Sequence, residues 1–367
     1  MVTGILISVS FLILSGLALA GLLLIAERRI LNFGICKIDI NDGKKVLEVS
    51  GGNNLLAVLA ENDIFIPSAC GGRGTCAYCK VKIVEGGGTP GPIETPYLTP
   101  REIEDRIRLS CQVRLRNDLR IRIPDHLFSI QRFQGRVEKK RPLTHDILEL
   151  RIKLTSPAEI NFRAGQYIQL ESAPYRGRES VMRAYSISSP PSRTHAVETV
   201  IRLVPDGICT TWVFEILKEN DPLTFSGPYG DFYLSETDRP CLFVAGGSGM
   251  APIRSMLLDM REKGNQRTVS YFFGALTQND LFYTDELREL ERETDWFRFI
   301  PALSNEPPDS GWDGERGLIT DVIARHHPDT SAYEAYLCGS PGMIDAAVKI
   351  LTEGGMPENQ VFYDKFA

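Results

Sequence analysis

The chain has 367 residues, of which 43% are apolar and 24% are charged, and its formal net charge is −6. This length suggests two or three domains, and the acidic balance argues against nucleic acid as a partner. Three of the eight cysteines lie within ten residues, while the others are scattered. Such clustering differs from the even disulfide framework of a small secreted domain and favours a metal site in a reducing compartment.

The N-terminal segment carries no charged side chain before Glu27, and Ile5–Ala26 forms an apolar run of 22 residues. As a helix this run would be about 33 Å long, enough for a bilayer core of roughly 30 Å. Arg28 and Arg29 follow it, so the positive-inside tendency places the later domains on the cytoplasmic side. We predict a transmembrane anchor at residues 1–26, a linker at 27–35 and a single-pass protein of the inner (cytoplasmic) membrane.

A cleaved signal peptide is the alternative for this segment, because Ala18-Leu19-Ala20 resembles a cleavage site. No basic residue precedes the apolar run, and the run continues past Ala20. Both features favour an uncleaved anchor.

Residues 36–128 carry short alternating segments, and Asn41-Asp42-Gly43 between the first two predicts a β-hairpin. A glycine- and cysteine-rich loop interrupts the later elements. The predicted strands are Cys36–Ile40, Lys45–Val49, Lys80–Val84 and Arg114–Ile123, and the predicted helices are Asn54–Glu61 and residues 97–109.

Residues 133–235 contain short strands separated by Gly/Pro turns, which predicts a small antiparallel β-barrel. One helix, Thr210–Leu217, interrupts the strands. The predicted strands are Gln134–Lys139, Ile147–Lys153, Tyr167–Leu170, Ala184–Ile187, Thr199–Leu203 and Pro222–Ser226.

Residues 237–367 alternate strands with helices, which predicts a doubly wound α/β domain with a parallel sheet. The predicted strands are Cys241–Ala245, Thr268–Gly274, Phe297–Ala302, Ala335–Cys338 and Gln360–Tyr363. The predicted helices are Pro252–Lys263, Tyr283–Glu293, Leu318–His326 and Pro341–Glu353.

The cysteine loop has the spacing C-x5-C-x2-C, and a fourth cysteine follows far along the chain. Four thiolates are the ligand set of a [2Fe–2S] cluster, and glycine-rich backbone can donate hydrogen bonds to its sulfurs. The alternative is a structural zinc site, but such sites usually present two close cysteine pairs. The loop resembles that of plant-type ferredoxins, which implies a β-grasp domain. The predicted cluster ligands are Cys70, Cys76, Cys79 and Cys111.

A second motif, Arg183-Ala184-Tyr185-Ser186, suits a flavin. Arginine can neutralise a pyrophosphate, tyrosine can stack on an isoalloxazine face, and the Ser186 hydroxyl can reach the N5 atom that receives a hydride. The motif resembles R-x-Y-S of the ferredoxin–NADP reductase superfamily. Gly207, Thr210 and Thr211 open a helix and form a predicted anion site for the FAD pyrophosphate. Gly227-Pro228-Tyr229-Gly230 matches the G-P-x-G turn of that superfamily.

A third motif, Gly246 to Pro252, follows an apolar strand and opens a helix, so Gly246, Gly247 and Gly249 are predicted to bind the pyrophosphate of a nicotinamide nucleotide. It resembles the superfamily's G-G-x-G-x-A-P loop. Cys338-Gly339-Ser340-Pro341 resembles the superfamily's C-G-P-P element near the nicotinamide. Phe366 matches the terminal aromatic residue that covers the flavin in many members and moves aside when the nucleotide binds. Ser186, Cys338 and Phe366 are the predicted catalytic residues.

The turn after the second strand of this domain bears on the choice of nucleotide. A 2′-phosphate requires an arginine there in this superfamily, and Leu276 stands at the corresponding place. We therefore expect NADH rather than NADPH.

The predicted parts follow one another in the order of anchor, ferredoxin domain, flavin barrel and nucleotide domain. This order resembles that of the F subunits of sodium-translocating NADH:quinone oxidoreductases. This resemblance implies FAD, a [2Fe–2S] cluster and NADH as cofactors, with integral membrane subunits or a quinone as partners. Two features depart from the family: only residues 171–182 stand where members carry a long insert before the R-x-Y-S motif, and the tail reads Asp364-Lys365-Phe366-Ala367.

The resulting hypothesis is a membrane-anchored reductase that passes a hydride from NADH to FAD and then single electrons to the cluster and a membrane acceptor. Two alternatives remain at this stage. One is a reductase that feeds a separate oxygenase, although such reductases normally lack an anchor. The other is a non-enzymatic electron carrier or assembly scaffold.

Overall fold

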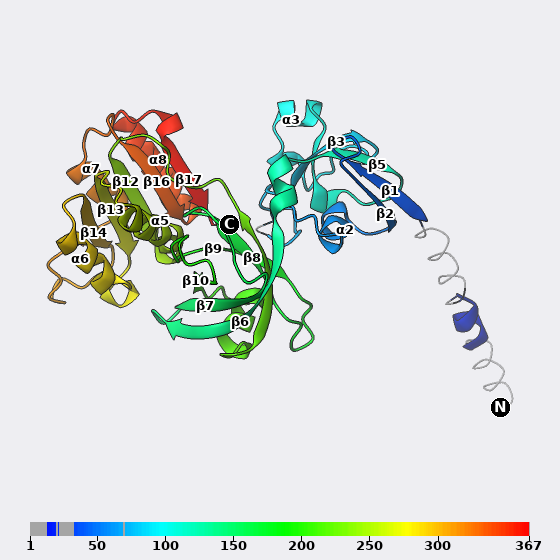
Figure 1. The fold of residues 1–367 in the computed structure, drawn as a ribbon, viewed down its shortest axis with the longest axis horizontal. Coiled ribbons are helices and arrows are strands. Elements are labelled where there is room, and N and C mark those ends of the chain that lie inside the picture. The colour runs from blue at the N-terminus through cyan, green and yellow to red at the C-terminus, as the bar shows by residue number, and fades with distance from the viewer. Residues whose placement is uncertain (1–12, 20, 22–32, 69, 367) are drawn as a thin grey trace, which may run out of the picture. The chain divides into compact units, whose positions relative to one another are not determined.

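The computed structural model describes residues 13–19, 21, 33–68 and 70–366, and in this part of the chain the strands form three β-sheets (Figure 1). Contacts divide the chain into two units, which are described separately below. One unit comprises residues 1–66 and 72–129, and the other comprises residues 67–71 and 130–367.

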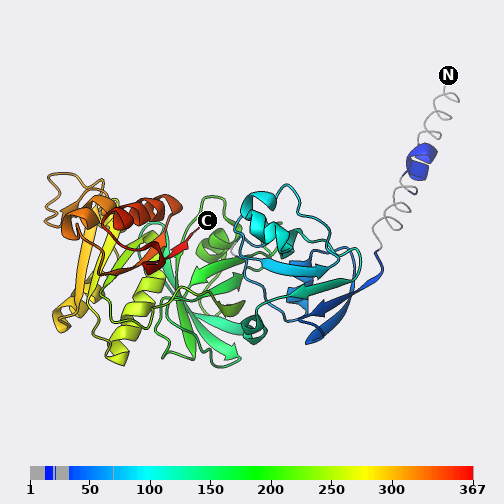
Figure 2. The same cartoon turned by 90° about the horizontal axis from the view of Figure 1, so that it is seen from above.

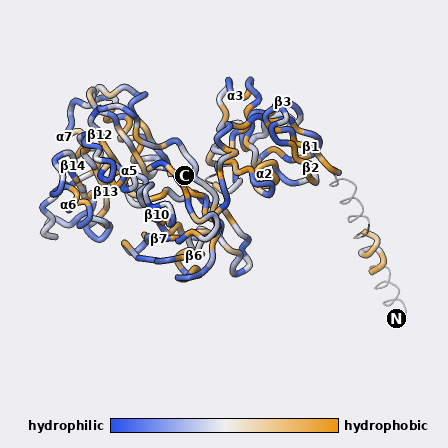
Figure 3. The backbone as a smooth tube through the Cα atoms, viewed as in Figure 1, coloured by the Kyte–Doolittle hydropathy of each residue, from blue (hydrophilic) through white to orange (hydrophobic). Residues whose placement is uncertain are grey.

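Most of the predicted anchor, residues 1–26, lies outside the described residues. Residues 13–19 are helical and apolar, as their orange colour in Figure 3 shows. None of the helices in the described ranges combines the length and the apolar character needed to cross a membrane.

The first sheet has the strand order β2-β1-β5-β3-β4, in which β1 and β5 run parallel and the other pairs run antiparallel. The predicted hairpin is confirmed, because Asn41, Asp42 and Gly43 have φ angles of 53°, 55° and 90°, the left-handed region that tight hairpin turns need. The strands are β1 Ile35–Ile40, β2 Lys45–Ser50, β3 Lys80–Glu85, β4 Ile107–Leu109 and β5 Leu119–Arg122.

Helix α2, Leu55–Glu61, begins where the Asn54 side chain accepts a hydrogen bond from the backbone N–H of Ala57. Its apolar face is fully or nearly fully buried. The buried side chains are Leu55, Leu56, Val58 and Leu59.

The prediction of one helix over residues 97–109 is wrong. Helix α3 spans only Pro100–Glu104, and Arg106 then adopts a positive φ of 58°, which ends the helical path. The next residues form β4, which pairs with β3. The predicted strand Arg114–Ile123 is likewise shorter, since only β5, Leu119–Arg122, makes sheet pairs.

The second sheet is an antiparallel barrel of six strands in the order β10-β7-β6-β11-β8-β9. A bridge between Ile187 and Thr199 nearly closes it. Helix α4 (Ile208–Thr211) leads into a π-helical turn, Trp212–Ile216, whose Trp212 and Val213 side chains pack into the barrel core. The strands are β6 Gln131–Pro142, β7 Ile147–Ser156, β8 Tyr167–Glu171, β9 Met182–Ser186, β10 Ala196–Arg202 and β11 Pro222–Tyr229.

The third sheet is parallel throughout, in the order β15-β14-β13-β12-β16-β17. Its elements match the predicted alternation, apart from the short strand β15, which the sequence pattern missed. They are β12 Cys241–Gly246, α5 Met250–Lys263, β13 Val269–Ala275, α6 Thr284–Glu293, β14 Phe297–Leu303, β15 Glu315–Arg316, α7 Ile319–His326, β16 Glu334–Gly339, α8 Pro341–Glu353 and β17 Val361–Lys365.

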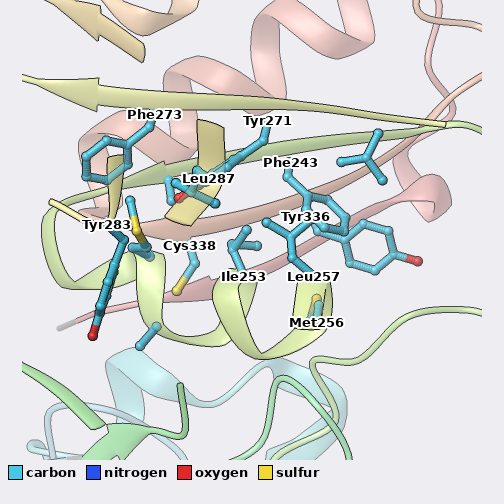
Figure 4. Close-up of a cluster of buried hydrophobic side chains, with 14 of the residues drawn as sticks. Phe243, Ile253, Met256, Leu257, Tyr271, Phe273, Tyr283, Leu287, Tyr336 and Cys338 are labelled. Atoms are coloured by element: carbon cyan, nitrogen blue, oxygen red, sulfur yellow. The ribbon is translucent and has the colours of Figure 1, made fainter. Parts of the chain in front are cut away.

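Helices cover both faces of this sheet, as Figure 2 shows. On one face, Phe243 and Tyr271 pack with Ile253 of α5 and Leu287 of α6. On the other face, α7 and α8 cover the alternate side chains of the same strands. Figure 4 shows the first of these cores, in which aromatic side chains from adjacent strands lie over α5. This is the predicted doubly wound arrangement.

A buried arginine joins the nucleotide-binding domain to the barrel. Arg254 of α5 is 8% exposed, and its guanidinium donates to Glu198 of β10 at 3.1 Å. It also forms a two-point ion pair with Glu286 of α6 at 2.7 and 2.9 Å. Its carbon Cζ lies 4.5 Å from the centre of the Tyr283 ring. The two domains therefore share one buried charge cluster.

We expect Arg254→Met to reduce the free energy of unfolding of this unit by about 3–5 kcal/mol, because it leaves two carboxylates without their buried partner. Chemical denaturation of the full chain, followed by fluorescence, measures the change. Arg261→Met is the matched control, since Arg261 lies on the same helix in an exposed pair with Glu293 and should cost less than about 1 kcal/mol. Equal losses in the two variants would contradict this role of Arg254.

Candidate functional site

The pairing of β3 with β4 brings two of the predicted cluster ligands together. Lys80 pairs with Leu109, and the backbone N–H of Ser110 donates to the carbonyl of Cys79 at 2.8 Å. The Cys79 and Cys111 sulfurs consequently lie 3.4 Å apart, and both residues are buried. This separation is far longer than a disulfide bond of about 2.05 Å, so no disulfide joins the two side chains.

Cys70 and Cys76 lie in the glycine-rich loop and are partly exposed. Gly74 needs its glycine, because φ is +79° and a Cβ would lie 2.9 Å from both the Gln112 side chain and Ile93. Gln112 in turn donates from Nε2 to the Cys111 sulfur at 3.4 Å. Sequence reasoning missed Gln112, although it directly follows a predicted ligand.

The donor chemistry of this site fits a two-iron cluster. The hydrogen bond with Cys111 and burial both raise the pKa of the Cys79 thiol, so ionising it requires nearby positive charge. Bound metal ions supply such charge and deprotonate a coordinating thiol. Among the described residues, no three His, Cys, Asp or Glu side chains are grouped as a single metal ion would need. A close pair of thiols suits one iron of a two-iron cluster better than a four-thiolate zinc site.

A buried ion pair holds the strand that leads to Cys111. Arg108 is 5% exposed and Glu94 is 1% exposed, and Arg108 Nε donates to Glu94 Oε1 at 2.9 Å. The backbone N–H of Leu109 donates to the other carboxylate oxygen at 3.0 Å. Burial alone would raise the pKa of Glu94, but hydrogen bonds from Arg108, Gly91 and Leu109 outweigh it and lower that pKa. No motif in the sequence indicated this pair.

Strand β9 carries the predicted flavin residues at one end of the barrel sheet, where it pairs only with β8. Because side chains alternate along a strand, Arg183 and Tyr185 share one face and Ser186 lies on the other. Arg183 Nη1 donates to the carbonyl of Met182 at 2.7 Å, and Ser186 is 5% exposed.

The Tyr185 hydroxyl is consistent with a bound flavin. The oxygen is fully buried but makes no regular hydrogen bond, and its neighbour is the Cys209 thiol, a weak hydrogen-bonding group. Buried polar atoms normally have a partner, so an additional hydrogen-bonding group is expected here. Burial raises the pKa of Tyr185 well above its usual value and that of Cys209 to about 11, so both groups stay neutral.

The turn before α4 approaches its own helix closely. A Cβ on Gly207 would lie 2.5 Å from Thr210 Oγ1, so only glycine fits. The Thr210 hydroxyl bonds within this turn, accepting from the backbone N–H of Val204 at 3.2 Å. Thr211 and backbone N–H groups are therefore better candidates than Thr210 for hydrogen bonds to the FAD pyrophosphate. The pyrophosphate-binding role predicted for Thr210 remains untested.

The predicted nucleotide loop connects β12 to α5. Gly246 ends the strand, Gly247 has a φ of 53°, and a Cβ on Gly249 would lie 2.2 Å from the carbonyl oxygen of Cys338. The helix start therefore packs directly on the end of β16, and only glycine permits this contact. Backbone N–H groups at the start of α5 suit an anionic phosphate.

The structure places the other two predicted residues beside this loop. Cys338 is fully buried among the side chains between the sheet and α5 (Figure 4), and burial raises its pKa well above the usual value. The backbone N–H of Phe366 donates to the carbonyl of Gly339 at 3.0 Å, and its ring packs against the same core. The catalytic roles of Ser186, Cys338 and Phe366 remain predictions.

Three protein-family models match the chain in the order of these sites. They are described as a 2Fe-2S iron-sulfur cluster binding domain at residues 38–116, an oxidoreductase FAD-binding domain at 134–233 and an oxidoreductase NAD-binding domain at 243–349. The chain is thus an NAD-dependent flavo-iron–sulfur oxidoreductase, which confirms the predicted FAD, [2Fe–2S] and nicotinamide cofactors.

Similar proteins narrow this class. The F subunit of Na(+)-translocating NADH-quinone reductase in Pseudomonas aeruginosa strain UCBPP-PA14 is 35% identical over 390 residues, which cover 95% of each chain. Its counterpart in Histophilus somni strain 129Pt is 33% identical over 392 residues, covering 95% of this chain and 96% of its own. The chain therefore belongs to the family of F subunits of Na(+)-translocating NADH-quinone reductases.

Solved structures share the three-domain fold. Amycolatopsis cytochrome P450 reductase GcoB superposes with a TM-score of 0.73 at 25% identity, covering 90% of this chain and 98% of its own. The ferredoxin reductase in carbazole 1,9a-dioxygenase superposes with a TM-score of 0.70 at 28% identity, covering 91% of this chain and 99% of its own.

We expect Cys79→Ser and Cys111→Ser each to abolish cluster binding, because each removes one thiolate of the close pair. Iron and acid-labile sulfide per chain provide the measurement. Cys36→Ser is the control, since Cys36 is also buried but lies in the β1–β2 hairpin, and it should keep the full iron content. A chain that keeps its iron with Cys70, Cys76, Cys79 and Cys111 all changed to serine would refute this ligand set.

Arg183→Met should weaken FAD binding by at least about tenfold, the scale expected for losing one charged hydrogen bond. Flavin content after purification and titration of the apoprotein with FAD measure this loss. Arg132→Met is a matched control on the same barrel, because Arg132 pairs with Glu171 at an exposed position. Unchanged FAD affinity in the Arg183 variant would remove Arg183 from the flavin site.

Proposed function

We propose that this chain oxidises NADH and delivers the electrons to a quinone in a sodium-translocating membrane complex. The observation that carries the proposal is the identity of 33–35% to curated F subunits over 95% of the chain. The overall reaction consumes NADH, a proton and a quinone, and it produces NAD⁺ and a quinol.

Each of the three sites, for flavin, nucleotide and cluster, contributes its own residues to this reaction. When bound, FAD accepts an electron pair as a hydride and releases electrons singly, and a [2Fe–2S] cluster carries one electron at a time. Arg183 offers positive charge for the FAD pyrophosphate, and the partly exposed Tyr185 ring offers a stacking surface. Ser186 places a hydroxyl at the end of the same strand.

On the nucleotide side, the Gly246–Gly249 loop binds the NADH pyrophosphate, and α5 orients it through the helix start. Phe366 must leave its position for the nicotinamide to reach the flavin. On the cluster side, Cys70, Cys76, Cys79 and Cys111 hold the irons, while the Gln112 amide N–H near the Cys111 sulfur favours the more negatively charged, reduced cluster.

A membrane location follows from the same proposal. The apolar run Ile5–Ala26, with Arg28 and Arg29 after it, supports one anchor with the three domains on the cytoplasmic side of the inner membrane. Integral membrane subunits are the partners that this arrangement would meet.

A reductase that feeds an oxygenase is the second candidate. The structural similarity to a cytochrome P450 reductase and to a dioxygenase reductase over 90–91% of the chain favours it. Affinity purification from membranes separates the two, because co-purifying integral membrane subunits support the quinone reductase and a co-purifying oxygenase supports the second candidate.

Anaerobic titration of the detergent-solubilised full chain with NADH tests the proposed reaction. We expect bleaching of the flavin absorbance, appearance of the paramagnetic signal of a reduced [2Fe–2S] cluster, and reoxidation of both by a short-chain ubiquinone. If NADH does not bleach the flavin absorbance, the proposed enzymatic activity is refuted and the non-enzymatic electron carrier or scaffold is supported. Reoxidation by ferredoxins or an oxygenase but by no quinone would refute quinone as the acceptor.

A further inference from the structure

Tyr283 directly precedes helix α6 and has a backbone conformation that residues with a side chain rarely adopt. Its φ and ψ angles are 55° and 15°, in the left-handed region, where a bulky aromatic residue is unusual. Such a conformation persists only where the surrounding contacts hold it. Tyr283 is 9% exposed and belongs to the core that includes side chains of the parallel sheet and α5. Contacts of its own side chain therefore account for this placement.

The side chain of Tyr283 reaches from the nucleotide domain to the flavin barrel. Its hydroxyl donates to Glu149 Oε2, on β7, at 2.6 Å. Figure 4 shows this hydroxyl at the end of the side chain that points away from the sheet. The guanidinium carbon Cζ of Arg254 lies 4.5 Å from the centre of the tyrosine ring, and that of Arg141 lies 5.4 Å from it. One side chain thus joins the start of α6 to the barrel.

Glu149 is held in place as the acceptor of this bond. It is 6% exposed, and Arg141 on the neighbouring strand β6 donates to it from Nε and Nη2 at 3.2 and 2.9 Å. Burial alone would raise the pKa of Glu149, but hydrogen bonds from Arg141 and Tyr283 outweigh it and lower that pKa. Because Arg141 remains as a partner, loss of the Tyr283 hydroxyl would leave the carboxylate paired. Removing this hydroxyl therefore tests orientation more than folding.

The Tyr283–Glu149 bond adds a second attachment between the two domains. Helix α5 supplies the first, because Arg254 donates to Glu198 of β10 and to the carbonyl of Ser188. Strands β7 and β10 are paired, so the two carboxylates come from adjacent strands of the barrel. A body attached at one place can rotate about that place, whereas a second attachment through another helix and another strand fixes the angle.

This angle bears on hydride transfer. The loop Gly246–Gly249, predicted to bind the pyrophosphate, belongs to the nucleotide domain, whereas the predicted flavin residues Arg183 and Tyr185 belong to the barrel. Hydride transfer requires reacting atoms about 3–3.5 Å apart, and a misplacement of about 1 Å can cost about a hundredfold in rate. A small change of angle would slow the transfer and leave the contacts of the nucleotide within its own domain intact.

We propose that Tyr283 is a positioning residue for hydride transfer, and that its bond to Glu149 fixes the angle at which the nucleotide domain places the nicotinamide against the flavin. This inference rests on the proposed function, since it concerns the same reaction. The hydride passes from the nicotinamide to the flavin, and Tyr283 transfers no proton. Burial raises the pKa of Tyr283, so its hydroxyl stays protonated and remains a donor to Glu149.

Anaerobic stopped-flow reduction of the full-length holoenzyme by NADH tests the proposal. We expect Tyr283→Phe to lower the limiting rate of flavin reduction by about tenfold or more, and to change the NADH dissociation constant by less than about twofold. The charge-transfer absorbance of the NADH–flavin complex should weaken, because it reports stacking of the two rings. Glu149→Leu should give the same loss of rate, and the double variant should be no slower, since both changes break the same bond.

Tyr271→Phe is the matched control. It removes a hydroxyl from the same core that is buried and, among the described residues, has no hydrogen-bond partner, so it should keep the wild-type rate. Flavin absorbance and chemical denaturation show that each variant is folded. An unaltered limiting rate in Tyr283→Phe, or a loss that appears only as weaker NADH binding, would overturn this inference alone. A wild-type flavin that NADH does not reduce would instead overturn the proposed function.

Discussion

The buried guanidinium of Arg254 joins the flavin barrel to the nucleotide domain. A hydride moves only between atoms in near contact, so the flavin barrel and the nucleotide domain must hold a fixed relation. Arg254 lies on α5 five residues after Gly249, and it bonds to Glu198 of the barrel and to Glu286 of its own domain. The helix whose start is predicted to bind the pyrophosphate is thus also the helix that joins the domain to the barrel.

The cysteine site depends on a different constraint, the cost of ionising buried thiols. Strand pairing brings Cys79 and Cys111 close together, and the buried Glu94–Arg108 pair fixes the segment before Cys111. Neither feature supplies the positive charge that two thiolates need. The protein therefore provides a preorganised pair of thiols, and the positive charge of the iron in the predicted cluster would favour their ionisation.

The correct predictions of cofactors and domain types came mostly from short local motifs. The cysteine spacing, the R-x-Y-S tetrapeptide and the glycine loop each lie within a few residues, so the sequence reveals them directly. Predictions failed where tertiary contacts decide. Residues 107–109 form a strand because β3 lies beside them, and Arg114 forms only an isolated bridge, with Asn54, outside the sheet. The Glu94–Arg108 and Glu198–Arg254 contacts join positions 14 and 56 residues apart, and no periodicity in a single sequence indicates such pairs.

The enclosed thiol of Cys209 has a bearing on oxygen tolerance. Peroxide, which reduced flavins produce with dioxygen, attacks thiolates and spares protonated thiols. Cys209 is 1% exposed and lies beside the Tyr185 hydroxyl, and its pKa near 11 keeps it almost wholly protonated at neutral pH. Protonation and burial therefore protect this sulfur atom from oxidation, although it lies beside Tyr185, the tyrosine predicted to stack on the flavin.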